Sequence, residues 1–301
     1  MKIFLAGGSG TIGIPLVRAL VASGHEVTAL TRSPGKQAEL RALGATPAVA
    51  DALDRDALLT AVANARPTHV IHQLTALPKE GPRSAKDIEA TNRLRIAGTR
   101  NLLEAAIKAG ARRFIVGSFA LLSDRGTPAP TGNTAAVAVR SMERQVMEAT
   151  ANGSIEGVVL RYGMFYGLEA PSTVKMIDMV RKRRLPVVRG DASQLPLIHI
   201  EDAVSATLAA LDRAPAGSAY DIVDDQAVSM TQIVEAIAKY TGSPAPFRVP
   251  AWLPRLIAPY MARMTSVRMP LSNAKAKTEL GWQPKYSTMR DGLARMFSRA
   301  A

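Results

Sequence analysis

The chain has 301 residues, of which 47% are hydrophobic and 21% are charged. That length and balance allow one large α/β domain, or a nucleotide-binding domain with a smaller addition, and they argue against long disordered stretches. The sequence contains no cysteine, which excludes disulfides, thiolate catalysis and cysteine-ligated metal.

The net charge is +13, from 38 Lys and Arg against 25 Asp and Glu. Such an excess can attract nucleic acid, anionic lipid or phosphorylated substrates. No nucleic-acid motif accompanies it, so we interpret it as a solvated basic surface and expect no nucleic-acid partner. The first residues form too short an apolar run for a signal peptide, and no run approaches the ~18 residues of a membrane span. We therefore expect a cytoplasmic protein with no membrane span.

Short apolar runs alternate with helical patterns from the start to about residue 160, which is typical of repeated βαβ units with a parallel sheet. The predicted strands are residues 3–6, 26–31, 47–50, 69–73, 113–118 and 157–161. The clearest helix is predicted over residues 87–109, where apolar residues recur at helical spacing and Gly110 follows as a terminator. Another helix is predicted over residues 133–151, capped by Asn133 or Thr134.

Beyond Arg161 the alternation weakens, and many prolines separate shorter elements. The sequence therefore predicts an α/β fold: a Rossmann-type doubly wound parallel sheet with a small irregular C-terminal substrate-binding region. We expect a dinucleotide-binding Rossmann region at residues 1–165. A mixed region at 166–301 would complete the sheet and form the substrate pocket. We interpret its aromatic and methionine side chains as core or as a pocket wall suited to an apolar substrate; they are Trp252, Tyr260, Met261, Met264 and Met269.

The strongest motif is a glycine-rich turn, residues 7–13, directly after the first predicted strand and at the start of a helix. Glycine permits the tight turn and the close approach of backbone to a diphosphate, and the helix N-terminus offers N–H groups and partial positive charge. We expect this turn to bind a dinucleotide. The binding residues would be Gly7, Ser9, Gly10, Thr11, Ile12 and Gly13.

The end of the second predicted strand lacks the acidic residue that binds the ribose hydroxyls in NAD sites. Arg32 stands there instead, and a guanidinium pairs well with a 2′-phosphate, with Ser33, Ser9 or Lys36 as additional donors. The sequence thus favours NADP (NADPH) over NAD, although Arg32 could also be an ordinary loop arginine. Asp51, after the third strand, could accept a hydrogen bond from the adenine amino group or cap a helix.

Several separated segments together resemble the extended short-chain dehydrogenase/reductase family, also called the NAD(P)-dependent epimerase/dehydratase family. They are residues 7–13, 72–76, Asn92 with 98–103, 160–167, 199–203 and 280–284. The resemblance implies that Leu74, Thr75 and Ala76 flank the cofactor and that Asn92 lies near the site. It also implies that the segment after Arg161 lines the nicotinamide and substrate pocket. Family members often dimerise through a helix pair, so a homodimer is one expectation, although the sequence itself does not determine the oligomeric state.

Members of this family usually carry a Ser or Thr after the fifth strand and a YxxxK pair on the next helix, where the tyrosine is the general acid or base. Here the serine position is Phe119, one residue past Ser118, and adjacent strand residues point to opposite faces. The next predicted helix has neither Tyr nor Lys, and Ala135 and Val139 stand at those positions. Arg140, one residue further on, is a candidate to hold the ribose.

Hydride transfer would then need other catalytic residues, and Tyr162, Tyr166 and Ser118 are the candidates. His199 is a further candidate, because an imidazole can carry a proton near neutral pH. For Tyr166 and His199 a packed, hydrogen-bonded role is the competing interpretation.

Three functions remain open. The first is an atypical NADP-dependent oxidoreductase of a small, fairly apolar carbonyl, enone or hydroxyl substrate, with the proton from Tyr162, Tyr166 or water. The second is a non-redox isomerase, cyclase or lyase on the same fold. The third is a non-catalytic NADPH sensor or assembly protein.

Overall fold

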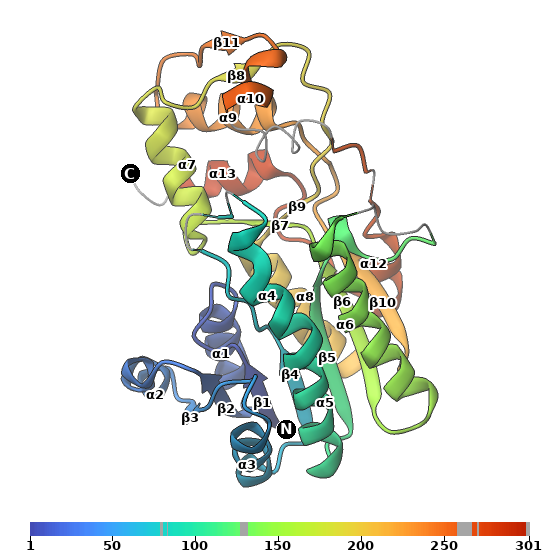
Figure 1. Cartoon of the computed structure of the whole chain (residues 1–301). Helices are drawn as coiled ribbons and strands as arrows, with labels where there is room; N and C mark the ends of the chain where they lie inside the picture. The colour runs from blue at the N-terminus through green and yellow to red at the C-terminus, as the bar shows by residue number, and fades with distance from the viewer. Residues whose placement is uncertain (79–80, 83, 127–131, 258–266, 270, 299–301) are drawn as a thin grey trace.

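The computed structural model describes residues 1–78, 81–82, 84–126, 132–257, 267–269 and 271–298 (Figure 1). Its centre is a seven-stranded sheet in which every neighbouring pair is parallel. In spatial order the strands are β10 (Ser218–Ile222), β6 (Glu156–Tyr162), β5 (Arg113–Phe119), β4 (His69–His72), β1 (Lys2–Ala6), β2 (Glu26–Thr31) and β3 (Thr46–Val49). The predicted doubly wound parallel sheet is confirmed, and each of the six predicted strands lies within one residue of its expected bounds.

The strand order reverses between β1 and β4, which lie side by side with Ala6 opposite His72. Chain segments leave these two strands toward different sides, so a crevice opens at their carboxyl ends. Ligands of open α/β sheets bind at such a switch point. The glycine-rich turn follows β1 and the segment of residues 74–76 follows β4, so the fold brings the two predicted cofactor segments together.

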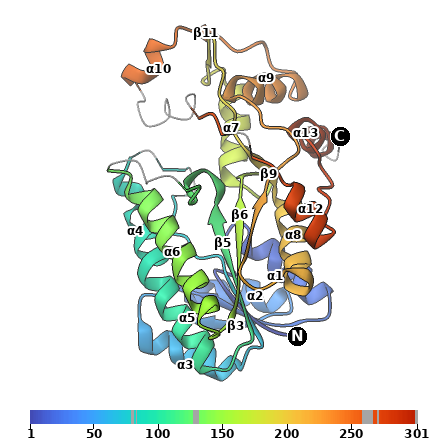
Figure 2. The same ribbon diagram turned by 90° about the vertical axis from the view of Figure 1, so that its right-hand side faces the viewer.

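Helices cover both faces of the sheet, as Figure 2 shows in a view along its edge. One face packs on α1 (Gly13–Ala22), α2 (Gln37–Ala42), α8 (Ile200–Arg213) and α12 (Ala274–Leu280). The other packs on α3 (Arg55–Ala65), α5 (Thr99–Lys108) and α6 (Thr134–Ala151). Alternate strand residues supply the two cores, with Leu5 and Ile115 on the first face and Phe4 and Phe114 on the second.

The helix predicted over residues 87–109 is present, but it is not uniform. It consists of α4 (Glu89–Arg93), a π-helical turn over Leu94–Gly98 and α5. Gly110 ends it at φ +73°, in the conformation that glycine adopts readily, as predicted. The wider turn leaves the carbonyl of Ile96 to accept a hydrogen bond from Gln145 Nε2 of α6, at 3.2 Å. Asn133 caps α6 by accepting from Ala136 N at 3.0 Å.

The C-terminal part lies beyond the carboxyl edge of the sheet (Figure 1). It has its own buried cluster, to which α7 (Pro171–Arg181), α9 (Met230–Tyr240) and α13 (Met289–Ser298) contribute. Two small parallel sheets join it, β7 (Met164–Tyr166) with β9 (Leu197–His199) and β8 (Val187–Val188) with β11 (Arg248–Val249).

The short helix α10 (Trp252–Ile257) carries the first of the predicted aromatic and methionine side chains of this region. Trp252 is 62% exposed, so it is not part of the core. Met269 is half-buried, and Tyr260, Met261 and Met264 lie outside the described residues. Within the described ranges, none of the helices combines the length and the apolar character that crossing a membrane requires.

Candidate functional site

The glycine-rich turn packs tightly between β1, β2 and the segment after β4. Gly7 has φ +92°, and a Cβ there would lie 2.7 Å from the carbonyl oxygen of Gln73. A Cβ on Gly13 would overlap the carbonyl oxygen of Gly7. Any side chain at these two positions would push the turn apart, so glycine is required for helix α1 to approach the sheet this closely.

Helix α1 presents its N-terminus to the crevice. Its first i→i−4 hydrogen bond runs from Ile14 N to Gly10 O, at 3.1 Å. The N–H groups of Thr11, Ile12 and Gly13 precede that bond and belong to the turn of the helix that leaves donors without helical acceptors. These donors and the helix dipole fit a diphosphate, and the glycine cradle leaves room for it.

Arg32 and Ser33 directly follow β2, and both are exposed. Thr31 organises this edge, because its Oγ1 lies 2.9 Å from Ser9 Oγ and accepts a hydrogen bond from Ser33 N at 3.2 Å. Lys36 pairs instead with Glu39, at 2.7 Å. The structure therefore brings Arg32 and Ser33 to the same edge as the glycine turn and ties Lys36 to a neighbouring carboxylate.

Asp51 lies in the turn before α3 and accepts a hydrogen bond from Leu53 N at 2.9 Å through Oδ1. The cap of α3 is Asp54, which accepts from Ala57 N at 3.1 Å. Asp51 thus shapes the turn next to β3, and its proposed bond to adenine stays a prediction.

The segment after β4 is fixed by buried groups beneath it. Gln73 N donates to Ala6 O at 2.8 Å, Leu74 N donates to His72 Nδ1 at 3.1 Å, and Ala76 N donates to Thr91 Oγ1 at 3.0 Å. Since His72 Nδ1 accepts, its Nε2 carries the proton and donates to Thr99 Oγ1 at 2.9 Å. The start of this segment therefore lies beside Gly7 of the glycine turn. That Leu74, Thr75 and Ala76 flank the cofactor stays a prediction.

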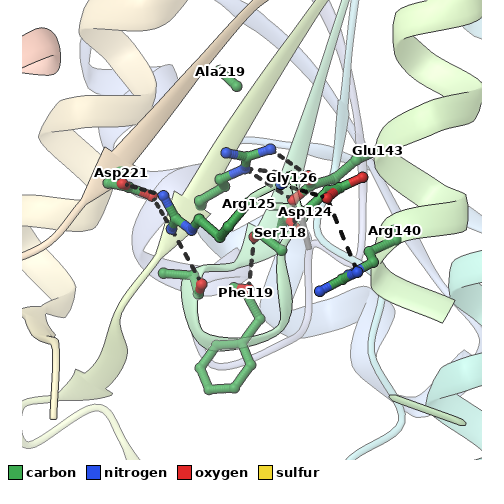
Figure 3. A network of polar contacts seen from close by, with 12 residues as sticks. Ser118, Phe119, Asp124, Arg125, Gly126, Arg140, Glu143, Ala219 and Asp221 are labelled. Carbon is green, nitrogen blue, oxygen red and sulfur yellow. Dashed lines mark hydrogen bonds and ion pairs between the residues drawn. The ribbon is translucent and has the colours of Figure 1, made fainter. Parts of the chain in front are cut away.

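Ser118 faces α6 in a buried ionic network (Figure 3). Its hydroxyl donates to Glu143 Oε1 at 2.5 Å, and Arg161 Nη2 donates to Glu143 Oε2 at 2.7 Å. Figure 3 shows the ring of Phe119 turned away from this contact. The network joins β5, β6 and α6, and it gives Ser118 a structural partner on the face opposite to Phe119.

The segment after β5 is held by two further contacts in the same figure. Arg125 forms a bidentate pair with Asp221 of β10, with distances of 2.8 and 2.6 Å (Figure 3). Arg140 Nη1 lies 4.0 Å from Asp124 Oδ1. These pairs anchor the chain on both sides of the site, and they place Arg140, the candidate ribose ligand, against a carboxylate.

Tyr162 is buried in the core between the sheet and α8. Gln73 Nε2 donates to its hydroxyl at 3.1 Å, and the hydroxyl lies 2.7 Å from Thr207 Oγ1. Thr207 itself donates to Ala203 O, so it accepts from Tyr162. Burial raises the pKa of Tyr162 to about 12. The phenol proton is thus used in a buried hydrogen bond to Thr207. The role of Tyr162 as proton donor stays a prediction, and these contacts do not support it.

Tyr166 and His199 form an aromatic cluster with Tyr286. The ring centroids of Tyr166 and His199 lie 5.1 Å apart, and those of His199 and Tyr286 lie 4.3 Å apart. Burial and the nearby negative charge of Asp224 raise the pKa of Tyr166 far above its usual range. His199 caps α8 by accepting from Glu201 N at 3.2 Å. This arrangement matches the packed role that sequence reasoning held as the alternative.

Ala135 and Val139, which the family resemblance predicts at the positions of the usual tyrosine and lysine, are both buried. Polar groups near them come from other elements. Asn92 Nδ2 donates to Thr134 Oγ1 at 3.3 Å, while its buried Oδ1 has no partner within the described residues. Two groups received no role from the sequence. Gln73, which follows β4, binds Ala6 of β1 and Tyr162 of β6. Arg95 is a buried cation, and the only feature of the sequence that could have indicated it is an arginine on the inner side of a predicted helix.

Together the parallel sheet, the switch point and the glycine cradle define a protein with a Rossmann-type fold. Residues 3–223 match the NAD dependent epimerase/dehydratase family, and the chain belongs to that family.

The chain is 38% identical to the 3-diazoavenalumate denitrifying reductase of a Streptomyces species, over 98% of this chain and 100% of that protein. It is 26% identical to a 4-hydroxy-2-methyl-3-oxo-4-farnesyl-3,4-dihydroquinoline-1-oxide ketoreductase of Stigmatella aurantiaca, over 97% and 95%. Among solved structures, the UDP-glucose 4-epimerase of Thermus thermophilus with NAD superposes with a TM-score of 0.79 at 23% identity, covering 99% and 98% of the two chains. At that identity the likeness establishes the fold alone. The relatives of this chain include both reductases and epimerases.

Proposed function

We propose that the protein is an atypical NADP-dependent oxidoreductase that reduces a small, fairly apolar acceptor without the usual Ser/Tyr/Lys set. The observation that carries this proposal is a contrast within one crevice. The glycine cradle at β1 is complete, whereas the catalytic positions opposite it are Phe119, Ala135 and Val139. When bound, reduced nicotinamide supplies a hydride; the side chains at those three positions supply no proton.

The lack of a general acid at these positions limits which substrates can accept the hydride. A carbonyl gains a hydride at carbon and must also gain a proton at oxygen, which water would have to provide here. An arenediazonium ion gains a hydride at carbon and releases N2, and that substitution requires no proton. The first of the relatives above is named as a denitrifying reductase of a diazo compound. We therefore propose a diazo or diazonium arene as the preferred acceptor class, with small carbonyl compounds as slower acceptors.

Arg32 supports the choice of NADP. It is exposed at the carboxyl end of β2, and neither it nor Ser33 is the acidic residue that recognises the ribose hydroxyls of NAD. A guanidinium at this position binds a 2′-phosphate through charge-assisted hydrogen bonds. Structures of similar fold contain NAD, so the preference for the phosphorylated cofactor that we propose rests on Arg32 alone.

The test compares acceptors at fixed NADPH. Benzenediazonium, benzaldehyde and cyclohexenone are each mixed with protein and NADPH, and nicotinamide absorbance is followed against a reaction without protein. We expect diazonium reduction to be faster than carbonyl reduction, with a rate constant that is flat from pH 6 to 8. Tyr162→Phe, Tyr166→Phe and Ser118→Ala should keep the rate of diazonium reduction. A large loss of this rate in either tyrosine variant would indicate that the tyrosine acts as a general acid, and it would contradict the proposal.

Other outcomes separate the alternative functions. NADPH binding with no acceptor consumed would favour a sensor or assembly protein. Product formation without net NADPH consumption would favour a non-redox isomerase, cyclase or lyase.

A further inference from the structure

Arg95 lies within the π-helical turn between α4 and α5, on the side of the helix that faces β4. Thr91 and Thr99, one turn before and one turn after it, share this side. Thr91 Oγ1 binds Ala76 N at 3.0 Å and Thr99 Oγ1 binds His72 Nε2 at 2.9 Å. The two contacts bracket Arg95 and place it beside the carboxyl end of β4. Irregular π-helical turns often occur at functional sites.

Arg95 is a largely buried cation, and among the described residues no opposite charge acts on it. The residue is only 9% exposed. Within the described ranges no carboxylate forms an ion pair with it, and no hydrogen bond joins it to another side chain. Removing a cation from water in this way is costly unless an anion or strong acceptors surround it.

His72, whose pKa responds to the charge of Arg95, does not compensate that charge. His72 donates through Nε2 and accepts through Nδ1, so it is neutral. Burial and then the positive charge of Arg95 lower the pKa of His72 to about 4, which keeps it neutral at physiological pH. Burial also lowers the pKa of Arg95 to about 10, so the guanidinium stays charged at pH 7. A permanent cation thus stands beside a neutral imidazole at the switch point.

We infer that Arg95 binds an oxyanion, a phosphate or carboxylate group of a ligand that lies across the carboxyl end of β4. The inference rests on the proposed function, which supplies two sources for this group. One is the diphosphate of the dinucleotide, and the other is a carboxylate on the acceptor. The planar guanidinium recognises either group through paired hydrogen bonds.

The experiment compares Arg95→Met with the control Arg93→Met, which removes an exposed arginine of the same helix and the same charge. Because Met fills the buried space without a charge, Arg95→Met should leave the Tm of the ligand-free protein unchanged or higher. Its affinity for the oxyanion should fall about 10- to 100-fold. Arg95→Lys should keep an intermediate affinity, and Arg93→Met should match the wild type.

Three probes identify the source of the oxyanion. Loss of NADPH affinity in Arg95→Met indicates the diphosphate, whereas loss of benzoate affinity with NADP⁺ present, but not of benzamide affinity, indicates an acceptor carboxylate. Sodium sulfate tests the site without any cofactor, because it should raise the Tm of the wild type more than that of Arg95→Met. This result would support the site even if the protein bound no dinucleotide and the proposed function failed. A lower Tm of Arg95→Met with all affinities unchanged would make Arg95 a structural residue and overturn the inference.

Discussion

Asp224 is a buried carboxyl group whose replacement by Asn should stabilise the protein in a pH-dependent way. It follows β10, is 4% exposed, and has no hydrogen-bond partner for either carboxyl oxygen among the described residues. Burial raises the pKa of Asp224 to about 8, and the neighbouring carboxylate of Asp202 contributes further. The titratable groups that face it are Tyr166, Asp202 and Asp225, and the backbone N–H of His199 also lies near it.

The sign of the effect follows from the raised pKa of Asp224. Below about pH 4 both the folded and the unfolded chain keep this proton, so it costs no stability. Between pH 4 and 8 the unfolded chain releases the proton and the folded chain retains it, so the free energy of unfolding falls as pH rises. The slope is about 1.4 kcal/mol per pH unit, which gives about 3–4 kcal/mol between pH 5 and pH 8. Above pH 8 the loss is complete.

Asp224→Asn removes this dependence. The unfolding entropy of a chain this long is about 0.6 kcal/mol per kelvin, so the Tm difference between variant and wild type should grow by about 5 °C from pH 5 to pH 8. The unpaired amide of Asn costs about 1–3 kcal/mol, but that cost is the same at every pH. Thermal unfolding by circular dichroism across this pH range measures the difference.

Asp225→Asn is the matched control, one residue further on. Bonds from Lys277 and Asn273 outweigh the opposing effect of burial and lower the pKa of Asp225. Its carboxylate therefore contributes stability above about pH 4, and that contribution is lost only as pH falls further. Asp225→Asn should lower the Tm by the same amount at pH 5 and pH 8. An Asp224→Asn difference that is equally flat would refute the buried neutral carboxyl.

Three further substitutions test the site. Arg32→Asp should weaken NADPH binding about 10- to 100-fold and NADH binding much less; fluorescence titration measures both, and equal losses would refute the 2′-phosphate assignment. Gly13→Ala should abolish dinucleotide binding, because its Cβ overlaps Gly7, and a calorimetric titration that still shows binding would argue against the cradle. Tyr162→Phe should lower the free energy of unfolding in urea by about 1–3 kcal/mol, because Gln73 and Thr207 lose a buried partner, while the rate of diazonium reduction stays unchanged. A stability equal to that of the wild type would mean that the phenol contributes nothing to packing.

The sheet could be predicted from the sequence because local patterns determine it. Apolar runs of four to six residues alternate with segments of helical spacing, and each of the six runs lies in a strand of the parallel sheet. The glycine turn is equally local, since its steric requirement follows from the position of glycines between a strand and a helix. The irregular C-terminal part has no such repeat, and Trp252 shows the consequence. An aromatic side chain expected in a core or pocket wall is 62% exposed.

The roles of single polar side chains could not be predicted, because they depend on partners far apart in the chain. The hydroxyl of Tyr162 meets Gln73 and Thr207, which are 89 and 45 residues away. Arg95 is buried in a π-helical turn near the end of β4 and has no ionic partner in the part of the chain that the structure describes. The helical pattern of residues 87–109 does not reveal that turn. Asp224 has an unremarkable sequence neighbourhood, and its raised pKa comes from packing alone.

Titration of the wild type with NADPH, followed by nicotinamide fluorescence with Gly13→Ala as the negative control, tests the central claim most directly. The account predicts saturable binding at one site per chain, tighter for NADPH than for NADH and absent in the variant. Absence of binding by the wild type at millimolar concentrations of either dinucleotide would contradict it.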